Sequence, residues 1–426
     1  MEEKIESEPP KRFDRFNQTY ENPYNIFTKY LNGFTTLYEI GQKCKNNQLN
    51  PEIRSTVYKI LLNILPYNNP GSWKKILQEK RDLYYSKLNA LYSKNEYIKK
   101  FIECHAIKNT KPYEAIYKYL PEGDNAILSL IKLDVDRTFQ EMDLFRNIKV
   151  KELLTKILYV NSIDNPEPSY CQGMNEILGT LFYAFLPSVK YDKYTKEEHE
   201  IENNDNISNP EMLYSFIVCD EHFEADLFTV YSELMSRDLT LLYTYNSEKY
   251  RDKNNNVKYD LQNLKIEDLQ QSGESDLLKR IKKIFYIYLN KADKKYFDFL
   301  FGNIEPNLFL LRWILCMLDR EISLKNVLWT WDCILFYEFV EFTLEEKETS
   351  NDNNIHVCRL NFLDYLCLAM IMSLKKELIN SEPSVVLCKF LKFPNEKYIK
   401  FIINKAFQLA KEFNENKDKW EDDKLK

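Results

Sequence analysis

Apolar residues recur at helical spacing along almost the whole chain, and no other feature limits the possible fold as strongly. Ile53, Val57, Leu61 and Ile64, for example, fall on one face of a helix. Alternating strand patterns bounded by tight turns are nearly absent. We therefore predict an all-α fold, with further helices from residue 73 onward and near residues 123–136, 148–160, 170–186, 221–236, 276–290, 307–320, 323–337, 359–376, 382–391 and 396–413.

Local residue types mark where two of these helices begin. Asn50 and Pro51 suit an N-cap and a first helical position, and Pro66 ends that helix. Ser72 suits the N-cap of a helix that begins at Trp73. The sequence thus predicts helix starts at residues 51 and 73.

Three polar, charge-rich segments interrupt the helices, at residues 189–209, 245–274 and 343–356. They have little apolar periodicity, so we interpret them as surface insertions rather than domain linkers. The acidic run EEHEIENNDN in the first segment could bind a basic partner, although a solvated loop is the simpler interpretation. Residues 1–22 and 415–426 are expected to be flexible tails.

The charge balance and the cysteine pattern exclude several classes of protein. The formal net charge is −6, which gives no overall basic character for nucleic acid or an anionic membrane surface. Nine cysteines are scattered singly without a Cys-x-x-Cys pair, as expected of reduced thiols in a cytosolic protein. The charged N-terminus lacks the apolar core of a signal peptide, and Arg312 and Asp364 interrupt the longest apolar runs. We expect a protein without a transmembrane segment.

A polar cluster, Gln172-Gly173-Met174-Asn175, stands at the start of a strongly apolar segment, on what we expect to be the first turn of a helix. Ser169 lies three residues before Gln172, so one interpretation is a capping box that only satisfies free backbone groups. The other interpretation is a functional site at the mouth of the helix. The spacing alone is compatible with both.

A second motif lies upstream, in the segment IKLDVDR at residues 131–137. Asp134 and Arg137 are i,i+3 neighbours on a predicted helix, and an exposed pair of this kind is common and contributes only about 0.3–0.5 kcal/mol. Taken alone, this motif also allows a purely structural interpretation.

Together, these segments resemble the TBC domain, the GTPase-activating module for Rab-type small GTPases. That family is marked by I-x-x-D-x-x-R and then Y-x-Q-G-M, which appear here as IKLDVDR and YCQGM. An earlier mark, R-x-x-x-W before a leucine pair, is matched from Arg54 to Leu62 with Tyr58 in place of Trp. The segments at 222–235 and 307–335, with their RW, RE and WD pairs, also look like family segments. The resemblance covers about residues 40–410.

Within that family, the stretches YKILLNILPYNNPGSWKKILQEKRDLY and YCQGMNEI look most like the subgroup of member thirteen. The family resemblance also implies two lobes. Residues 38–238 would form the first lobe and carry the catalytic residues, and residues 239–414 would complete the groove for the GTPase.

The resemblance implies roles for six residues. Arg137 would insert an always-charged guanidinium beside the phosphates of GTP, and Gln172 would orient the attacking water with its carboxamide. Supporting roles would fall to Asp134, which would orient Arg137, and to Tyr170, Arg54 and Gly173 around the finger loops. Lys should replace Arg137 poorly.

The nucleotide itself must be held elsewhere. The chain has only 8 glycines and neither a Gly-x-x-x-x-Gly-Lys-Ser/Thr nor a Gly-x-Gly-x-x-Gly motif. We expect no cofactor or metal of its own, with GTP and Mg²⁺ held by a Rab-family small GTPase in its GTP state. The expected location is cytoplasmic, with recruitment to endomembranes and only indirect membrane contact.

Three alternatives stay open at this point. A catalytically silent TBC domain could bind a Rab without activating it, although the presence of both finger residues favours an active member. A thiol hydrolase would need Cys171 and one of four dispersed histidines, and no spacing supports it. Trp313, Trp329 and Trp331 could form a ligand cage, but their apolar helical surroundings indicate core positions.

Overall fold

The computed structural model describes residue 25 and residues 27–29, 36–104, 119–192, 210–243, 261–270, 274–345, 360–394 and 396–413. Within these ranges the regular structure is helical, without a β-strand. The predicted all-α fold is therefore confirmed. The predicted tails at 1–22 and 415–426 lie outside the described residues.

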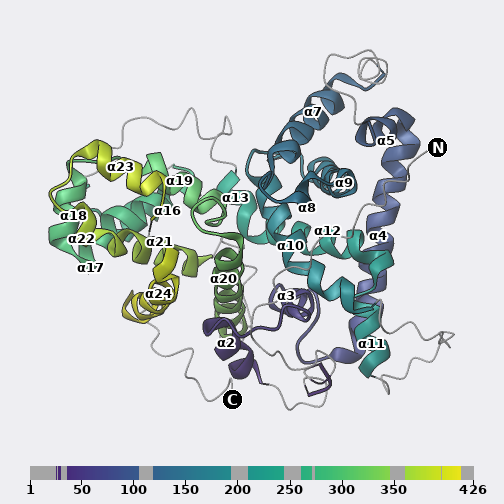
Figure 1. The fold of residues 1–426 in the computed structure, drawn as a ribbon, viewed down its shortest axis with the longest axis horizontal. Helices are drawn as coiled ribbons and strands as arrows, with labels where there is room; N and C mark the ends of the chain where they lie inside the picture. Colours follow the sequence, from purple (N-terminus) through teal and green to yellow (C-terminus); the bar gives the residue numbers. More distant parts are fainter. Residues whose placement is uncertain are drawn as a thin grey trace, which may run out of the picture.

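Two groups of helices flank a long central helix, α20 (Leu324–Glu345) (Figure 1). The group on the right of Figure 1 comprises α4 (Trp73–Lys94), α5 (Glu96–Ile102), α7 (Glu122–Arg137), α8 (Asp143–Arg146), α9 (Ile148–Asp164), α10 (Met174–Asp192), α11 (Pro210–Ile217) and α12 (Phe223–Leu234). The group on the left comprises α16 (Asp276–Lys282), α17 (Asn290–Ala292), α18 (Lys294–Phe301), α19 (Asn307–Leu315), α21 (Asn361–Ser373), α22 (Lys375–Leu378), α23 (Pro383–Leu391) and α24 (Ile399–Phe413). Near the centre lie α2 (Leu37–Lys45), α3 (Arg54–Leu61) and α13 (Thr240–Tyr243).

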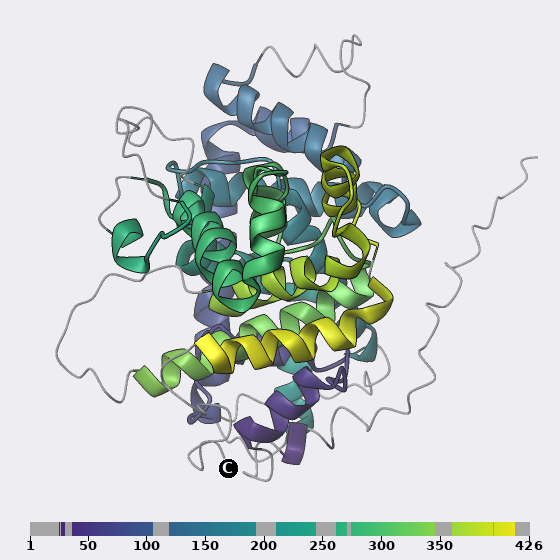
Figure 2. The ribbon, with the colours of Figure 1, turned by 90° about the vertical axis from the view of Figure 1, so that its left-hand side faces the viewer.

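Helix α20 is the element that both groups share. It packs against α2, α3 and α10 on one side and against α21 on the other. Helix α21 in turn packs along α24, so that α20, α21 and α24 lie side by side (Figure 2). The predicted lobe boundary at residues 238–239 falls inside a π-helical turn, Met235–Leu239, that continues α12 into α13. The two-lobe division stays a prediction.

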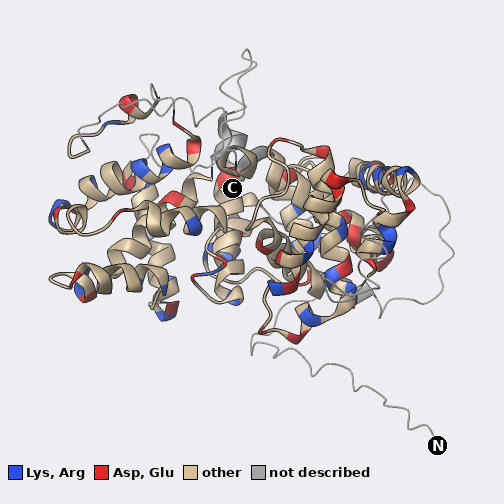
Figure 3. Cartoon of the chain, turned by 90° about the horizontal axis from the view of Figure 1, so that it is seen from above, with Lys and Arg blue, Asp and Glu red and all other residues tan. Residues whose placement is uncertain are grey.

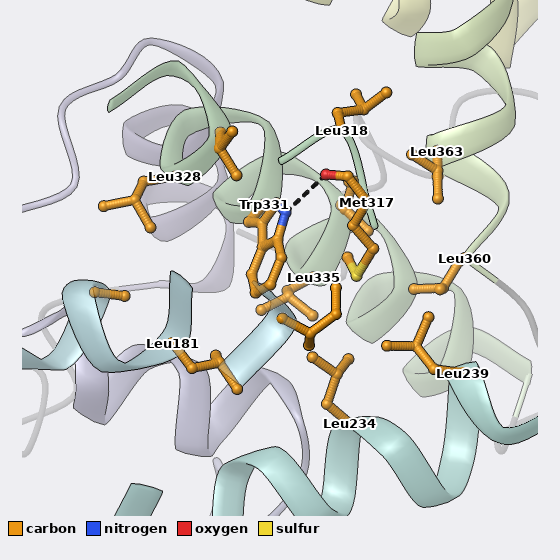
Figure 4. Packing of buried hydrophobic residues seen from close by; sticks show 14 of the residues in the cluster. Leu181, Leu234, Leu239, Met317, Leu318, Leu328, Trp331, Leu335, Leu360 and Leu363 are labelled. Carbon is orange, nitrogen blue, oxygen red and sulfur yellow. Dashed lines mark hydrogen bonds between the residues drawn. The ribbon is translucent and has the colours of Figure 1, made fainter. Parts of the chain in front are cut away.

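The three tryptophans that could have formed a ligand cage are core residues, as the sequence indicated. Trp313, Trp329 and Trp331 are all buried. The indole N–H of Trp331 donates to the carbonyl of Met317 at 3.0 Å, and leucines such as Leu181 surround the ring (Figure 4). Because these rings are enclosed by the protein's own apolar side chains, they form no open cage for a ligand.

A buried charge cluster joins the central helix α3 to α4 and α12 of the right-hand group. Asp226 of α12 accepts hydrogen bonds from Lys59 of α3 at 2.7 Å and from Arg81 of α4 at 2.7 and 2.9 Å. Burial alone would raise the pKa of Asp226, but the two cations lower it below its usual value. Elsewhere acidic and basic side chains are interspersed on the helices of both groups (Figure 3).

One of the two predicted helix starts is confirmed, and the predicted capping of both helices differs in detail. Helix α3 begins at Arg54 rather than residue 51, because the Asn50 side chain accepts the N–H of Glu52 at 2.8 Å and holds residues 50–53 in a turn. Helix α4 begins at Trp73 as predicted. Ser72 does not cap it with its side chain, because its hydroxyl donates to the carbonyl of Asn69 at 2.9 Å.

All three predicted polar insertions contain some helix, and in the first of them α10 continues to Asp192. Residues 266–270 form α15 (Ile266–Gln270), which is anchored by the buried side chains of Leu264 and Leu269, and α20 continues to Glu345. The expectation that these segments interrupt the helices was therefore wrong at these positions. Residues 193–209, 244–260, 271–273 and 346–359 lie outside the described part of the chain.

Candidate functional site

The C-terminal end of α7 presents Arg137. The acidic residues Glu122 and Asp124 lie in the first turn of this helix, where their negative charges stabilise the helix by interacting with the positive end of its dipole. Thr138 leaves the helical conformation (φ −68°, ψ 120°), and its hydroxyl donates to the carbonyl of Asp134 at 2.9 Å. Arg137 is thus the last helical residue, and 48 % of its side chain is exposed.

Asp134 is the buried partner of Arg137. Its carboxylate forms an ion pair with the Arg137 guanidinium through one oxygen and accepts the Tyr170 hydroxyl at 2.8 Å through the other. Burial and the adjacent Asp134 carboxylate raise the pKa of Tyr170, so its phenol keeps its proton for this hydrogen bond. The structure therefore brings together Asp134, Arg137 and Tyr170, three of the residues predicted from the two motifs.

Gln172 lies in a turn directly before α10 rather than on the first turn of the helix, because α10 begins at Met174. Its side chain is exposed and forms no hydrogen bond to another described residue. The capping-box interpretation was wrong: the Ser169 hydroxyl is directed to the carbonyl of Ser162 at 3.4 Å and does not reach the start of α10. The carboxamide of Gln172 is therefore accessible to a partner.

Two glycines allow the close packing around this turn. Gly173 has φ +104°, a conformation that other residues adopt rarely, and a Cβ there would lie 3.2 Å from the Tyr243 hydroxyl. Gly179 lies farther along α10, and a Cβ there would lie 2.9 Å from the ring of Phe139 and 3.0 Å from the Thr138 methyl. The absence of these side chains lets the turn with Gln172 lie close to Tyr243 and lets the segment after Arg137 lie close to α10.

Asn175 joins the two motifs directly, a role that sequence reasoning missed. Its amide nitrogen donates to the Thr138 hydroxyl at 2.8 Å, and its oxygen accepts the Gly173 N–H at 3.1 Å. The adjacency of Asn175 to the Tyr-x-Gln-Gly-Met motif was the available signal, but its partner 37 residues upstream could not be identified from spacing.

A second missed contact holds α10 from the other side. Glu176 forms an ion pair with Arg320, which follows α19, with N–O distances of 2.7 and 2.8 Å to Nε. Nearby, burial and the Glu176 carboxylate raise the pKa of Asp319 well above its usual value. These contacts fix the helix that follows Gln172 against the C-terminal half of the chain.

Arg54 does not contact the turn at residues 170–173. Its guanidinium binds Asp332 of α20 through two hydrogen bonds of 3.0 and 3.1 Å, and Tyr58 donates to the same carboxylate at 2.9 Å. Tyr58, which replaces the Trp of the family motif, is buried and takes part in this contact. In the structure Arg54 joins α3 to α20, and its support of the finger loops stays a prediction.

The geometry offers an accessible guanidinium and an accessible carboxamide from two segments that are hydrogen-bonded to each other. Among the described residues the thiol alternative has no support, because burial raises the pKa of Cys171 and His222, the one histidine described, lies beside the Tyr85 hydroxyl at 3.4 Å. In the described ranges, no group of three His, Cys, Asp or Glu side chains could hold a metal ion. No helix of the described residues is long and apolar enough to span a membrane.

Comparison of the chain with known proteins identifies its family. The model of the Rab-GTPase-TBC domain matches residues 51–379. Human TBC1 domain family member 5 is 24 % identical over 371 residues, which covers 84 % of this chain and 41 % of that protein. The GTPase-activating protein gyp1 of Schizosaccharomyces pombe is 24 % identical over 370 residues, covering 85 % of this chain and 55 % of gyp1. The chain thus spans about half the length of these curated relatives or less.

The predicted subgroup is not confirmed. Human TBC1 domain family member 13 is 23 % identical over 234 residues and covers 55 % of this chain, less than the match to member 5. Among solved structures, the Ypt/Rab-GAP domain of Gyp1p has a TM-score of 0.60 at 18 % sequence identity, and the match covers 92 % of this chain and all of that one. This likeness shows a shared fold.

Proposed function

The chain belongs to the Rab-GTPase-TBC domain family, and from that premise we propose that it activates a Rab-type small GTPase by supplying Arg137 and Gln172 to the partner's bound GTP. The observation that carries the proposal is the shared hydrogen-bond network: Asp134 and Asn175 connect the segment of Arg137 to the turn of Gln172, and both functional side chains face solvent. The names of gyp1 and of the Gyp1p domain agree with this activity.

Each side chain would supply something that a small GTPase lacks. The guanidinium of Arg137 would stabilise the charge that develops on the phosphate oxygens, an effect worth about 10³–10⁵ in rate. The carboxamide of Gln172 would accept a hydrogen bond from the attacking water and donate one to the partner. GTP and Mg²⁺ would be held by the GTPase in its GTP state, and hydrolysis would return it to the GDP state and end its signal in vesicle trafficking.

The structure suggests why Arg137 can serve this role. Asp134 holds only one side of the guanidinium, while the exposed half of the side chain leaves N–H groups for phosphate oxygens. Tyr170 holds the carboxylate from behind. Asp134 and Tyr170 would therefore position Arg137 without touching the nucleotide.

Single-turnover hydrolysis of GTP by a panel of Rab proteins tests the proposal. The wild-type chain should accelerate at least one of them, Arg137→Ala should abolish the acceleration while binding stays measurable, and Gln172→Ala should lower it severely. Arg146→Ala is a matched control, because Arg146 is also exposed and also paired with an Asp three residues before it. Full activity of the Arg137 variant would refute the mechanism.

A silent scaffold is the second candidate. Binding of a Rab in its GTP form without acceleration by the wild-type chain would favour it. In that case Arg137→Ala and Gln172→Ala should leave the observed hydrolysis rate at the intrinsic rate of the GTPase.

A further inference from the structure

The exposed face of α7 carries an uninterrupted uncharged row that ends at Arg137. Gly123, Ala126, Leu130 and Leu133 are all exposed, and with Arg137 they follow the i, i+3, i+7, i+10, i+14 spacing of one helix face. Leu130 is 42 % and Leu133 is 57 % exposed. We call these five residues the α7 row.

These leucines are not part of the helix's core contact. Helix α7 already buries an opposite face, with Leu128, Ile131 and Val135, and it packs on α9. A surface helix ordinarily places charged and polar residues on its solvent side. Two exposed leucines on that side are available for contact with a partner protein.

Apart from Arg137, the one cation of α7 is Lys132, and its side chain is directed away from the row. The ammonium group of Lys132 donates to the carbonyls of Phe101 at 2.5 Å and Cys104 at 2.7 Å, at the end of α5. Burial accordingly lowers the pKa of Lys132. The surface along Leu130 and Leu133 is consequently apolar until Asp136 and Arg137.

A third exposed aliphatic side chain stands near the same end of α7. Ile148 begins α9 and is 48 % exposed. One turn later, Lys151 forms an ion pair with Asp136 at 3.0 Å, which places the first turns of α9 beside the end of α7. Apolar surface thus approaches Arg137 from two helices.

We propose that Leu130 and Leu133 form an apolar docking surface for the same GTPase whose nucleotide Arg137 reaches. This inference rests on the proposed function. At 1.5 Å per residue, Leu133 lies about 6 Å and Leu130 about 10 Å along the helix from Arg137. A standard interface buries about 800 Å² on each partner, equivalent to a disc of roughly 16 Å radius. A GTPase that presents its nucleotide to Arg137 therefore covers both leucines.

The chemistry of the partner surface follows from the row. It must be apolar and lie next to the nucleotide site, because a charged surface pressed on Leu130 and Leu133 would lose its hydration without compensation. Since these contacts exist both before and during hydrolysis, they contribute to binding and not to the chemical step. Their loss should weaken association and leave the maximal rate unchanged.

Leu130→Gln, Leu133→Gln and the double variant separate these effects, because Gln keeps helix propensity and approximate size. Single-turnover GTP hydrolysis is measured against increasing concentration of the chain, and binding is measured in parallel with GTPases loaded with a non-hydrolysable GTP analogue. We expect the double variant to raise the half-saturating concentration and the dissociation constant about tenfold or more, with a maximal rate within about twofold of wild type. Leu83→Gln on α4, also exposed at 49 %, is the matched control and should change neither.

The outcomes distinguish this inference from the proposed function. If the wild-type chain binds a GTPase without accelerating it, the proposed function fails, while weaker binding by the double variant still supports docking on the row. Unchanged binding and half-saturation in the double variant overturn the inference even where acceleration is intact. A wild-type dimer that the double variant converts to monomers, measured by light scattering, also overturns it, because the row would then contact a second copy. Absence of both binding and acceleration overturns both proposals.

Discussion

Asp134 is the residue at which the two motifs meet. A buried carboxylate is costly unless charged or hydrogen-bonding groups compensate it, and here Arg137 compensates one oxygen and Tyr170 the other. The arrangement fixes the base of an otherwise exposed Arg137 side chain. Asp134 and Arg137, whose i,i+3 spacing is also that of an ordinary surface pair, are thereby joined to the segment of Tyr170, 36 residues from Asp134.

Replacement of Arg137 by Lys tests whether the planar fork matters or only the charge. Lys has a single ammonium group, which cannot bind Asp134 and present several N–H groups to phosphate oxygens in the fixed geometry of a guanidinium. We expect Arg137→Lys to lose most of the roughly 10³–10⁵-fold acceleration that an arginine finger supplies. Single-turnover hydrolysis measures it, with Arg146→Lys as control. Acceleration within a few-fold of wild type would show that charge alone suffices.

Tyr170→Phe tests the support behind Asp134. The substitution removes the hydroxyl that donates to the buried carboxylate at 2.8 Å, so the free energy of unfolding should fall by about 1–3 kcal/mol. Because the ion pair with Arg137 remains, the maximal rate should fall much less than in Arg137→Ala. Urea unfolding and single-turnover assays measure the two effects, with the exposed Tyr398→Phe as control. Unchanged stability would mean that this hydrogen bond contributes little.

At the scale of the elements, apolar periodicity predicted most of the helices. Their ends depend on local hydrogen bonds from side chains to the backbone, which periodicity does not show. The periodic stretch around Ile53 was recognised, yet the Asn50 side chain turns the backbone and delays α3 to Arg54. Helix α15 escaped prediction because only Leu264 and Leu269 anchor a polar segment, too few for a visible period. Six candidate site residues came from motif resemblance, and physical spacing alone would have left Gln172 and Arg137 as ordinary surface residues.

Close contact between α10 and the segment after α7 leads to a prediction for Gly179. An added methyl group would lie 2.9 Å from Phe139 and 3.0 Å from the Thr138 methyl, so Gly179→Ala should cost about 1–3 kcal/mol of stability. The strain should also displace the end of α7, and a shift of about 1 Å at a catalytic group can cost roughly a hundredfold in rate. Gly302→Ala, where a Cβ meets nothing within 4 Å, is the control for both measurements. Wild-type stability and rate in Gly179→Ala would show that Phe139 and Thr138 move aside at little cost in free energy.

Glu321, which binds Arg312 of α19, should make stability depend on pH. Burial raises its pKa from 4.5 to about 7, although Arg312 and Arg320 oppose the rise and Glu176 adds to it. Between pH 4.5 and about 7, Glu321 therefore keeps its proton in the native state but has released it in the unfolded chain. The free energy of unfolding should therefore fall as pH rises from about 4.5 to about 7, by at most about 1.4 kcal/mol per pH unit.

Glu321→Gln should make this slope shallower in urea unfolding measured across that pH range. Buried Asp319, whose pKa is also raised, contributes a slope of the same sign that the variant keeps. Glu377→Gln, at an exposed ion pair with Lys389, controls for the loss of a surface carboxylate. An identical slope in Glu321→Gln and wild type would exclude titration of Glu321 in this range.

At the scale of the whole molecule, a few charged contacts join parts of the chain that sequence spacing cannot pair. Arg54 and Asp332 are 278 residues apart, and Glu176 and Arg320 are 144 residues apart. The sequence marked several of these positions through the RE and WD pairs of the family segments, but it did not identify their partners. Since a charge can pair with any opposite charge that the fold brings close, only the three-dimensional arrangement selects among them.

Arg54→Ala tests whether Arg54 acts on the fingers or holds α3 on α20. Without the guanidinium, buried Asp332 keeps only Tyr58, and breaking a buried pair from one side costs about 3–5 kcal/mol of unfolding free energy. The double variant Arg54→Ala/Asp332→Ala should be less unstable than the sum of the single variants, because the uncompensated charge is gone. At a temperature where all variants are folded, we expect a maximal hydrolysis rate within about twofold of wild type. A rate loss like that of Arg137→Ala, with stability unchanged, would instead assign Arg54 to the support of the fingers.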